Sequence, residues 1–374
     1  MRTRAAVLRQ MGAPPPYAES RPLEVVEVEL DPPGPGELLV GVGAAGLCHS
    51  DLSVIDGSRP RVMPMALGHE AAGEVVGVGA GVEAFAAGDH VVLAFVPACG
   101  ECEPCRAGRA ALCEPGAAAN AAGTLLGGER RLGDLDGAPL NHHLGVSAFA
   151  EHIVVAEASA VKVDRELPYE LAALFGCAVL TGVGAVVNAA RVAPGDRVAV
   201  FGLGGVGLSA LLGAVLQKAT TIVAIDVVAA KLGLALELGA THAVAAGPDA
   251  VEAVRAATGG GADHAIETVG SARVLADAYA ATRRGGSTTT VGLPDPSQRL
   301  SIPAVSLVAE ERTLRGSYLG SSVPARDLPR FIELHRAGRL PVERLLTHRL
   351  SLDEVNEGFD RLASGAAVRQ AIVF

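Results

Sequence analysis

A glycine-rich turn between a short apolar strand and a long apolar helix is the feature that most limits how this chain can fold. The pattern G-x-G-x-x-G occurs here as Phe201-Gly202-Leu203-Gly204-Gly205-Val206-Gly207. The segment Asp196–Phe201 before it predicts a strand, and the apolar stretch after it, to about Lys218, predicts a helix. Glycines at these positions permit the tight turn, the approach of a phosphate to the backbone, and close packing of helix on strand. Such glycines recur in many turns, so it is the strand and helix around them that favour a dinucleotide-binding fold.

A second predicted strand, Thr221–Asp226, ends in an acidic residue 19 positions beyond Gly207. A carboxylate there accepts hydrogen bonds from the ribose hydroxyls of adenosine and repels a 2′-phosphate, so Asp226 predicts NAD rather than NADP. The free N–H groups and the dipole at the start of the helix suit a pyrophosphate. The alternative interpretation is a glycine-rich turn in an ordinary α/β protein.

The two halves of the chain have different patterns. From about residue 179, strands alternate with helices, which predicts right-handed βαβ units around a parallel sheet. The further elements predicted there are strands at Ala243–Ala245, Ala262–Glu267 and Ser287–Val291 and helices at Ala229–Leu238, Ala272–Thr282, Asp327–Ala337 and Leu352–Ser364, with a last strand at Gln370–Phe374. Residues 1–178 are mostly β, with strands predicted at Leu23–Leu30, Glu37–Gly43, Ala72–Val78, His90–Phe95 and His152–Val155. The stretch 116–145, rich in Gly and Ala, is predicted to be a long surface loop.

Composition and charge narrow the class of protein. Hydrophobic residues make up 49% and charged residues 19%, which favours a folded core over disorder. A net charge of −10 and an aromatic content of 3% argue against nucleic-acid and anionic-membrane partners. No stretch reaches about 18 unbroken apolar residues, and the start has no apolar core of a secretory signal. The chain is therefore expected in the cytoplasm.

Four of the six cysteines lie within 15 residues. They occur as Cys99-Gly-Glu-Cys102-Glu-Pro-Cys105 and then Cys113. Clustered cysteines in a cytoplasmic chain are more often metal ligands than disulfides, and this spacing suits tetrahedral zinc. Four thiolates leave no open position, so the predicted site is structural. The alternatives are four unrelated thiols, or a zinc ribbon that binds nucleic acid; the mixed charge of the segment argues against the ribbon.

Further motifs carry a resemblance to a known family. They are GLCHSD at 46–51, GHEAAGEV at 68–75, GCAVLTGVGA at 176–185, GLGGVG at 202–207 and the terminal VRQAIVF, together with the cysteine run. With these, the whole chain resembles the zinc-dependent medium-chain alcohol dehydrogenases, in particular the longer, dimeric members near the class III-like branch. The resemblance implies a GroES-like, mostly β catalytic domain at 1–178 and 319–374. An NAD-binding Rossmann domain with a doubly wound parallel sheet would be inserted in it at 179–318.

The resemblance also implies roles for single residues. Cys48, His69 and Cys177 would bind a catalytic zinc, and the four clustered cysteines would bind a structural one, giving two Zn²⁺ per chain. Ser50 would take the alcohol proton, Asp51 would fix the tautomer of His69, and Glu70 would lie behind the zinc. Contacts with NAD are implied for His49, Thr181, Gly202, Leu203, Gly204, Gly205, Val206, Gly207, Asp226, Lys231, Val291, Gly292, Leu293, Ser317, Tyr318, Leu319 and Arg369, of which His49 and Arg369 would face the pyrophosphate. The substrate pocket would be lined by Phe95, His143, Leu144, Leu293 and Tyr318.

Two departures from the family pattern bear on the reaction. Ser53 stands where many members have a histidine at the outer end of the proton path. Arg59 and Ala117 stand where the branch that oxidises a formaldehyde–thiol adduct has an acidic residue and an arginine. The expected function is zinc-dependent hydride transfer between NAD(H) and an alcohol, aldehyde or ketone, in a homodimer with no nucleic-acid or membrane partner. The alternatives are oxidation of an S-hydroxymethyl thiol adduct of formaldehyde by the same fold, and a zinc-ribbon binding protein.

Overall fold

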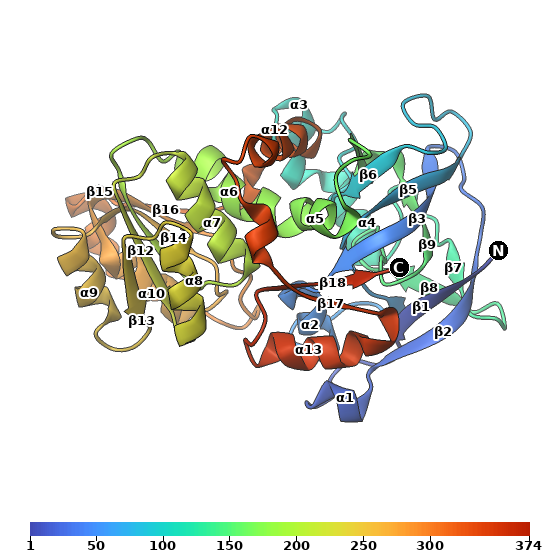
Figure 1. Ribbon diagram of the computed structural model, residues 1–374, viewed down its shortest axis with the longest axis horizontal. Helices are drawn as coiled ribbons and strands as arrows, with labels where there is room; N and C mark the ends of the chain where they lie inside the picture. The colour runs from blue at the N-terminus through green and yellow to red at the C-terminus, as the bar shows by residue number, and fades with distance from the viewer. The chain divides into compact units, whose positions relative to one another are not determined.

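The computed structural model describes residues 1–374 and divides them into two compact units (Figure 1). The first unit contains Met1–Cys177, Val323–Pro329 and Leu346–Phe374, and the second contains Ala178–Ser322 and Arg330–Leu345. This division differs from the predicted one chiefly at 330–345, a segment that lies in the second unit. An ion pair of 2.6 Å between Arg344 and Glu237 ties the segment to that unit.

The first unit is built from two sheets. One is a closed barrel in the order β1-β2-β7-β8-β4, formed by β1 (Arg2–Leu8), β2 (Leu23–Leu30), β7 (Leu132–Gly133), β8 (Pro139–His142) and β4 (Met65–Ala66). The other runs β10-β6-β5-β3-β18-β17 with β9 beside β3, formed by β10 (Ala160–Val163), β6 (His90–Leu93), β5 (Glu70–Val78), β3 (Glu37–Gly46), β18 (Arg369–Val373), β17 (Leu346–Leu350) and β9 (His152–Ala156). Because β18 pairs antiparallel with β3, the end of the chain completes a sheet that the N-terminal half begins.

Alternation of side chains explains why these strands pack as they do. At the end of β2, Val28 and Leu30 are buried while Glu27 and Glu29 are exposed, so one face meets the core there. Phe149 and Phe359 pack edge to face in this core, with ring centroids 6.1 Å apart. The helices of the unit are α1 (Tyr17–Ser20), α2 (His49–Ile55), α3 (Glu103–Arg106), α4 (Glu114–Ala122), α5 (Tyr169–Leu174), α13 (Val355–Ala363) and the start of α12 (Pro324–Arg336).

The stretch 116–145 is not the long surface loop that the sequence predicts. It contains most of α4 and the barrel strands β7 and β8. The sulfur of Cys113 accepts a hydrogen bond from the Gly116 N–H and so caps α4. Leu125, Leu132 and Leu140 are buried in the core. The prediction was wrong because small residues hide the helix pattern, and a strand of two residues gives no alternation to detect.

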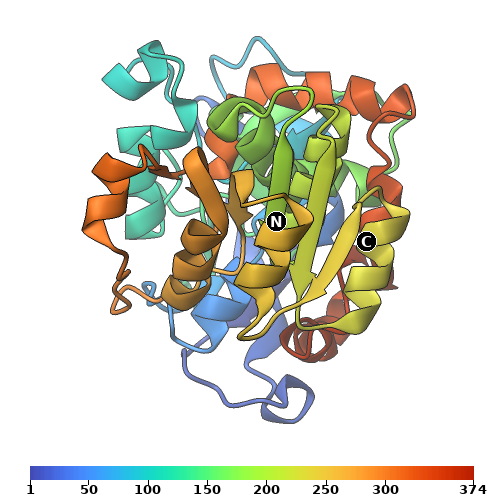
Figure 2. The same cartoon turned by 90° about the vertical axis from the view of Figure 1, so that its left-hand side faces the viewer.

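The second unit has a six-stranded sheet in the order β13-β12-β11-β14-β15-β16, in which every neighbouring pair is parallel. The strands are β11 (Arg197–Phe201), β12 (Thr221–Asp226), β13 (His242–Ala245), β14 (Ala262–Glu267), β15 (Thr282–Thr290) and β16 (Thr313–Gly316). The helices are α6 (Leu180–Gly184), α7 (Gly205–Leu216), α8 (Ala229–Glu237), α9 (Ala250–Ala257), α10 (Ala272–Ala281) and α11 (Ala304–Ala309). Helices lie on both faces of the sheet (Figure 2). The strand order reverses between β11 and β14, which confirms the predicted doubly wound sheet.

One helical segment, Tyr169–Ala190, is apolar and long enough to cross a membrane by length and composition alone. It consists of α5, a π-helical stretch at Phe175–Val179, α6 and a second π-helical stretch at Ala185–Ala190. Of its most apolar window, 83% is buried inside the molecule. A Cβ added at Gly182 would clash with the Val206 carbonyl oxygen of α7. Such close packing marks the segment as a core helix.

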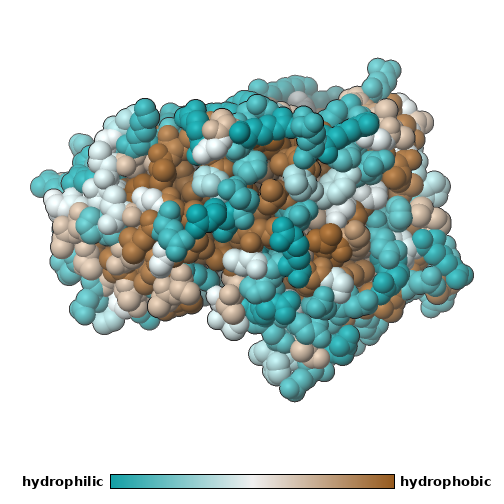
Figure 3. All heavy atoms as spheres, in the orientation of Figure 1, coloured by the Kyte–Doolittle hydropathy of each residue, from teal (hydrophilic) through white to brown (hydrophobic).

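Most large hydrophobic side chains are buried, but a few are exposed at positions that matter below. On the face drawn in Figure 3, hydrophobic residues show between polar ones. Val269 and Leu293 follow β14 and β15 and are 53% and 48% exposed. Val305 and Val308, on α11, are 72% and 82% exposed. Exposed apolar side chains at strand ends and beside an edge strand are candidates for contacts with a ligand or a second chain.

Candidate functional site

The first unit brings three potential metal ligands together from three distant parts of the sequence. Cys48 precedes the first turn of α2, His69 precedes β5, and Cys177 lies in the π-helical stretch after α5. All three side chains are buried, and their ligand atoms lie within 4.8 Å of one another. The Cys177 Sγ is 3.5 Å from the His69 Nε2. Two sulfurs and one imidazole nitrogen are a donor set that suits zinc and leaves a fourth position open, as in alcohol dehydrogenase itself.

A buried carboxylate orients the histidine of this set. Asp51 Oδ1 lies 3.1 Å from His69 Nδ1 and accepts a hydrogen bond from the Gly68 N–H. A proton held on Nδ1 by Asp51 leaves Nε2 free to face the two sulfurs, as a metal ligand requires. Burial by itself would lower the pKa of His69, but Asp51 and Cys48 raise it well above its usual value. The geometry therefore fits the role predicted for Asp51.

The two cysteines of the set shift each other's pKa in opposite directions. A hydrogen bond from Cys177 is the main cause that lowers the pKa of the Cys48 thiol well below its usual value. The same bond and burial raise the pKa of Cys177. Metal ligands bind as thiolates, so both side chains would be deprotonated with zinc bound.

Glu70 lies beside the cluster, with an arginine facing it. The Glu70 Oε2 is 3.3 Å from the Arg369 guanidinium, which also donates a hydrogen bond to the Leu47 carbonyl oxygen. Both carboxylate oxygens of Glu70 are buried and accept no hydrogen bond. Burial raises the pKa of Glu70 to about 7, although the Arg369 charge acts in the opposite direction. A Cβ added at Gly46 would clash with this carboxylate, so the glycine makes room for it.

Cys99, Cys102, Cys105 and Cys113 also come together, with ligand atoms within 4.8 Å of one another. Backbone N–H groups already point at two of the sulfurs: those of Cys99 and Gly116 at Cys113, and that of Cys102 at Cys99. Such hydrogen bonds lower the pKa of Cys99 to about 7. Four thiolates around one ion would hold this segment together.

The glycine turn has the shape expected of a phosphate-binding loop. Gly202 adopts φ +91°, which favours glycine, and a Cβ at Gly207 would clash with the Gly202 carbonyl oxygen. Gly204 caps α7, and a Cβ there would meet no atom within 4 Å. The space above Gly204 is therefore open, and α7 presents its N–H groups toward it.

Asp226, the last residue of β12, is joined to the glycine turn. One carboxylate oxygen accepts the Leu203 N–H at 2.6 Å and the other accepts the Val228 N–H at 2.9 Å. Lys231 lies in the first turn of α8, which follows directly. The carboxylate therefore has a structural role in the turn in addition to the ribose contact predicted for it.

Other predicted cofactor residues of the second unit lie at the carboxyl ends of the parallel strands or on α6. Val291, Gly292 and Leu293 follow β15, and Ser317, Tyr318 and Leu319 follow β16. The Ser317 N–H donates to the Thr290 carbonyl oxygen, so these two segments are neighbours. Thr181 is buried on α6. Because ligands of doubly wound folds bind at this edge of the sheet, the strand-end positions suit a dinucleotide.

In the first unit, the remaining predicted residues surround the metal-ligand set. Phe95 packs edge to face on His69 with centroids 5.3 Å apart, and Leu144 is buried with φ 54°. His49 and Ser50 form the first turn of α2, directly after Cys48. His49 and Arg369 both belong to this unit, and their contact with a pyrophosphate stays a prediction.

One contact at the site has no counterpart in the sequence prediction. His143 is predicted as a pocket residue, but its Nδ1 lies 3.0 Å from the same Asp51 oxygen that faces His69. The two imidazoles meet edge to face, 5.4 Å between centroids. The pair His142-His143 is visible in the sequence, but nothing there shows which of the two side chains turns toward Asp51.

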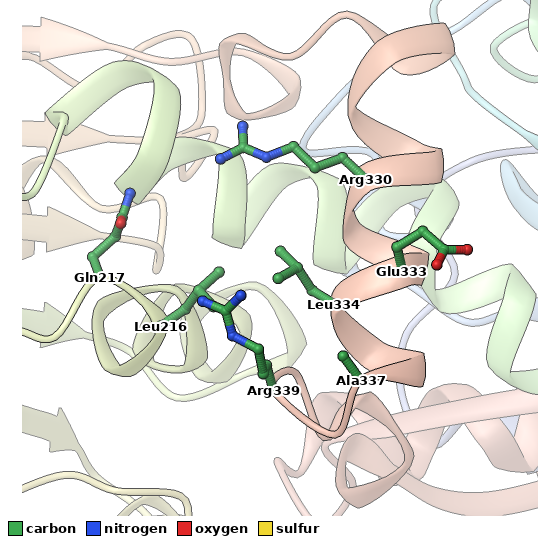
Figure 4. Close-up of a pocket in the computed structure, with 7 residues that line it drawn as sticks. All are labelled: Leu216, Gln217, Arg330, Glu333, Leu334, Ala337 and Arg339. Carbon is green, nitrogen blue, oxygen red and sulfur yellow. The ribbon is translucent and has the colours of Figure 1, made fainter.

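A hollow on the second unit is separate from all these residues (Figure 4). It is lined by Leu216, Gln217, Arg330, Glu333, Leu334, Ala337 and Arg339. None of the predicted site residues lies in it. The candidate site residues lie elsewhere, in the metal-ligand set of the first unit and in the strand-end loops of the second.

Comparisons with known proteins agree with this arrangement. A family described as alcohol dehydrogenase GroES-like domain matches residues 34–165, and a family described as zinc-binding dehydrogenase matches residues 205–336. The NDMA-dependent alcohol dehydrogenase of Amycolatopsis methanolica is 39% identical, over 100% of this chain and 99% of the relative. The S-(hydroxymethyl)glutathione dehydrogenase of Escherichia coli O139:H28 is 38% identical over 100% of both chains.

A solved structure extends the likeness to three dimensions. The alcohol dehydrogenase zinc-binding domain protein of Burkholderia ambifaria has a TM-score of 0.93 and 39% identity, covering 100% of this chain and 99% of that one. Sequence identity at this level over the full length, two family matches and a shared fold lead to one conclusion. This chain is an oxidoreductase that belongs to the zinc-dependent medium-chain alcohol dehydrogenase family.

Proposed function

We propose that this protein transfers hydride between NAD(H) and an alcohol, aldehyde or ketone, with two zinc ions per chain. The observation that carries the proposal is the buried set of Cys48, His69 and Cys177, whose donor atoms lie within 4.8 Å of one another. When bound there, zinc supplies the chemistry of a Lewis acid, which polarises an alcohol or carbonyl oxygen. The second ion is assigned to the four clustered cysteines. We place the protein in the cytoplasm, in keeping with its cysteine usage.

The residues of the chain prepare this site for such a reaction. Asp51 holds the His69 imidazole in one tautomer, so the ligand geometry is fixed before any substrate arrives. Phe95 packs edge to face against His69 and so supports the position of the imidazole. Ser50 lies two positions after Cys48, and in the proposed path its hydroxyl accepts the proton that an alcohol must lose while passing its own proton on to the next group.

The proposed reaction is tested by following NADH absorbance with a panel of primary and secondary alcohols, and its loss with aldehydes and ketones. The same assays with the formaldehyde adduct of glutathione test the alternative suggested by the likeness to S-(hydroxymethyl)glutathione dehydrogenase. Arg59 and Ala117 differ from the residues of that branch, so we expect simple alcohols to be the better substrates. Turnover only with the thiol adduct would contradict this choice.

A preference for NAD over NADP is expected because the Asp226 carboxylate repels a 2′-phosphate. Asp226→Asn removes the charge and keeps an oxygen for the Leu203 N–H, while the Val228 N–H loses its acceptor. We expect the ratio of kcat/KM for NAD over NADP to fall by an energy on the order of 1–3 kcal/mol. Steady-state kinetics with both cofactors measure it. A wild-type protein that already prefers NADP would contradict the role of Asp226.

The path of the proton gives a second prediction. The Ser53 hydroxyl donates to the His49 carbonyl oxygen at 2.8 Å, so it is engaged within α2 and offers no base. Ser53→His would add a group that titrates near pH 6.5, and it should raise alcohol oxidation near neutral pH more than in alkaline buffer. Ser50→Ala should reduce oxidation strongly at every pH. Parallel pH–rate profiles decide; an unchanged profile for Ser53→His, with no effect of buffer base, would contradict this account.

A homodimer is part of the proposal. β16 is an edge strand of the parallel sheet, and its outer N–H and C=O groups can pair with another strand. Val305 and Val308 of α11, shortly before it in the chain, are exposed apolar side chains. Sedimentation equilibrium should give twice the chain mass of 37.8 kDa.

A further inference from the structure

Glu267 is a buried acidic residue to which neither the sequence prediction nor the proposed reaction gives a role. It is the last residue of β14, and its side chain is 1% exposed. A carboxylate is rarely buried without partners, because the loss of its hydration is costly. Each of its contacts therefore shows what the residue holds in place.

The Glu267 carboxylate joins two neighbouring strand ends. Its Oε1 accepts the N–H groups of Val269 and Gly270, both at 2.7 Å. Its Oε2 accepts the Thr290 hydroxyl of β15 at 2.6 Å. The Glu267 carbonyl oxygen in turn accepts the Val291 N–H at 2.9 Å. Side chain and backbone together fix the loop after β14 to the end of β15.

The same loop is packed between the glycine turn and the segment after β15. The Thr268 hydroxyl lies 3.0 Å from the Gly202 carbonyl oxygen, to which it donates, and a Cβ at Gly202 would lie 2.6 Å from the Val269 side chain. On the other side, a Cβ at Gly270 would lie 2.9 Å from the Leu293 backbone nitrogen. The loop after β14 therefore packs against the glycine turn on one side and against the segment after β15 on the other.

The topology shows which half of a dinucleotide this loop would meet. Asp226 ends β12 on one side of β11, and Glu267 ends β14 on the other side. A dinucleotide binds across the point where the strand order reverses, with its pyrophosphate at the start of α7. If Asp226 holds the adenosine side, the nicotinamide side extends over the ends of β14 and β15. Val269 and Leu293 present exposed apolar side chains there, suited to the face of a flat ring.

We propose that Glu267 is a positioning residue for the nicotinamide half of the cofactor. It would hold Thr268–Gly270 and Thr290–Gly292 in the relative position that this half requires, without touching the cofactor. The inference rests on the proposed NAD site. The role proposed for Glu267 differs from those of the glycine turn and Asp226, which would bind the pyrophosphate and the adenosine.

The test compares two ligands that differ only in nicotinamide. Dissociation constants for NADH and ADP-ribose are measured by fluorescence and calorimetry on wild type, Glu267→Ala and Glu267→Gln. Glu267→Ala leaves two N–H groups without their acceptor, so we expect NADH affinity to fall about ten-fold or more, with ADP-ribose affinity changed less than about two-fold. Glu267→Gln keeps an acceptor for both N–H groups and should restore NADH affinity to near the wild-type value.

A matched control lies on the same strand. Asp263, at the other end of β14, accepts hydrogen bonds from the backbone N–H and the side chain of Arg197. Asp263→Ala should lower the melting temperature but leave the ratio of the dissociation constants for NADH and ADP-ribose unchanged. Thr290→Val removes only the hydroxyl contact to Glu267, so it can replace Glu267→Ala if that variant does not fold. It should weaken the binding of NADH but not that of ADP-ribose.

Three results would overturn the inference. Equal losses of both ligands in Glu267→Ala would show a general structural role. Unchanged NADH affinity in Glu267→Ala, or in Thr290→Val if Glu267→Ala does not fold, would show that the Glu267 contacts do not matter for the nicotinamide half. Wild-type protein that binds neither ligand would overturn the cofactor site itself, and the inference with it.

Discussion

Cys177→Ala is expected to lower alcohol oxidation by about three orders of magnitude or more, because it removes one ligand of a Lewis acid worth several kcal/mol. The fold should be kept, since the side chain is small and its neighbours in the helical stretch, Phe175, Ala178 and Val179, are buried. Elemental analysis should show the zinc content falling from two ions to one per chain. Kinetics and metal content are measured on the same preparation.

The control for this variant is the structural zinc, which should stay bound. Zinc bound by the four clustered cysteines should stay at one per chain in Cys177→Ala, and circular dichroism should match the wild type. Activity within about ten-fold of wild type, in protein that has lost one zinc, would contradict the catalytic assignment of the set.

Cys102→Ala should instead cause a large loss of stability, while the molecules that fold keep their activity. It removes one of four clustered ligands and leaves Cys99, Cys105 and Cys113 to hold the ion. A loss of several kcal/mol would lower the melting temperature by roughly 10 °C, or leave the protein insoluble. Thermal unfolding with and without added zinc measures the effect.

The soluble fraction of Cys102→Ala provides the decisive comparison. Because the catalytic set is formed by other residues, the properly folded molecules should still hold one zinc and still oxidise alcohols. A variant with unchanged melting temperature and two bound zinc ions would contradict the structural assignment of the four cysteines.

Much of the second unit could be predicted from the sequence because its signals are local. β12 and β14 begin and end where the sequence predicts, at Thr221–Asp226 and Ala262–Glu267. Each is a short run of β-forming or apolar residues bounded by turns, and the glycine turn fixes the chain direction between β11 and α7. The doubly wound order then follows from the right-handed crossover of βαβ units.

The contacts that complete the sites could not be predicted in this way. Asp51 and His143 lie far apart in the sequence, and His143 stands at the start of a turn with Leu144 at φ 54° and Ser147 at φ 57°. The Glu267 network needs the register in which Glu267 lies opposite Thr290. Neither backbone conformation nor strand register leaves a periodic signal in a single sequence.

The region 116–145 shows the same limit for secondary structure. Its helix is capped by the sulfur of Cys113, a residue that the sequence analysis assigned to metal alone. Its strands are short because they only close a barrel whose longer strands lie elsewhere. Composition rich in Gly and Ala therefore concealed a buried part of the fold.

The most direct test of the central claim is NAD-dependent alcohol oxidation measured against zinc content. The purified protein is assayed with a panel of alcohols as isolated, after chelation, and after zinc is restored, with metal content and circular dichroism recorded at each stage. The account predicts two zinc ions per chain, turnover with NAD that disappears when the ion of the Cys48–His69–Cys177 set is removed, and recovery when it is returned. Undiminished turnover in folded, zinc-free protein, or no turnover of any alcohol, aldehyde or ketone at full zinc content, would contradict it.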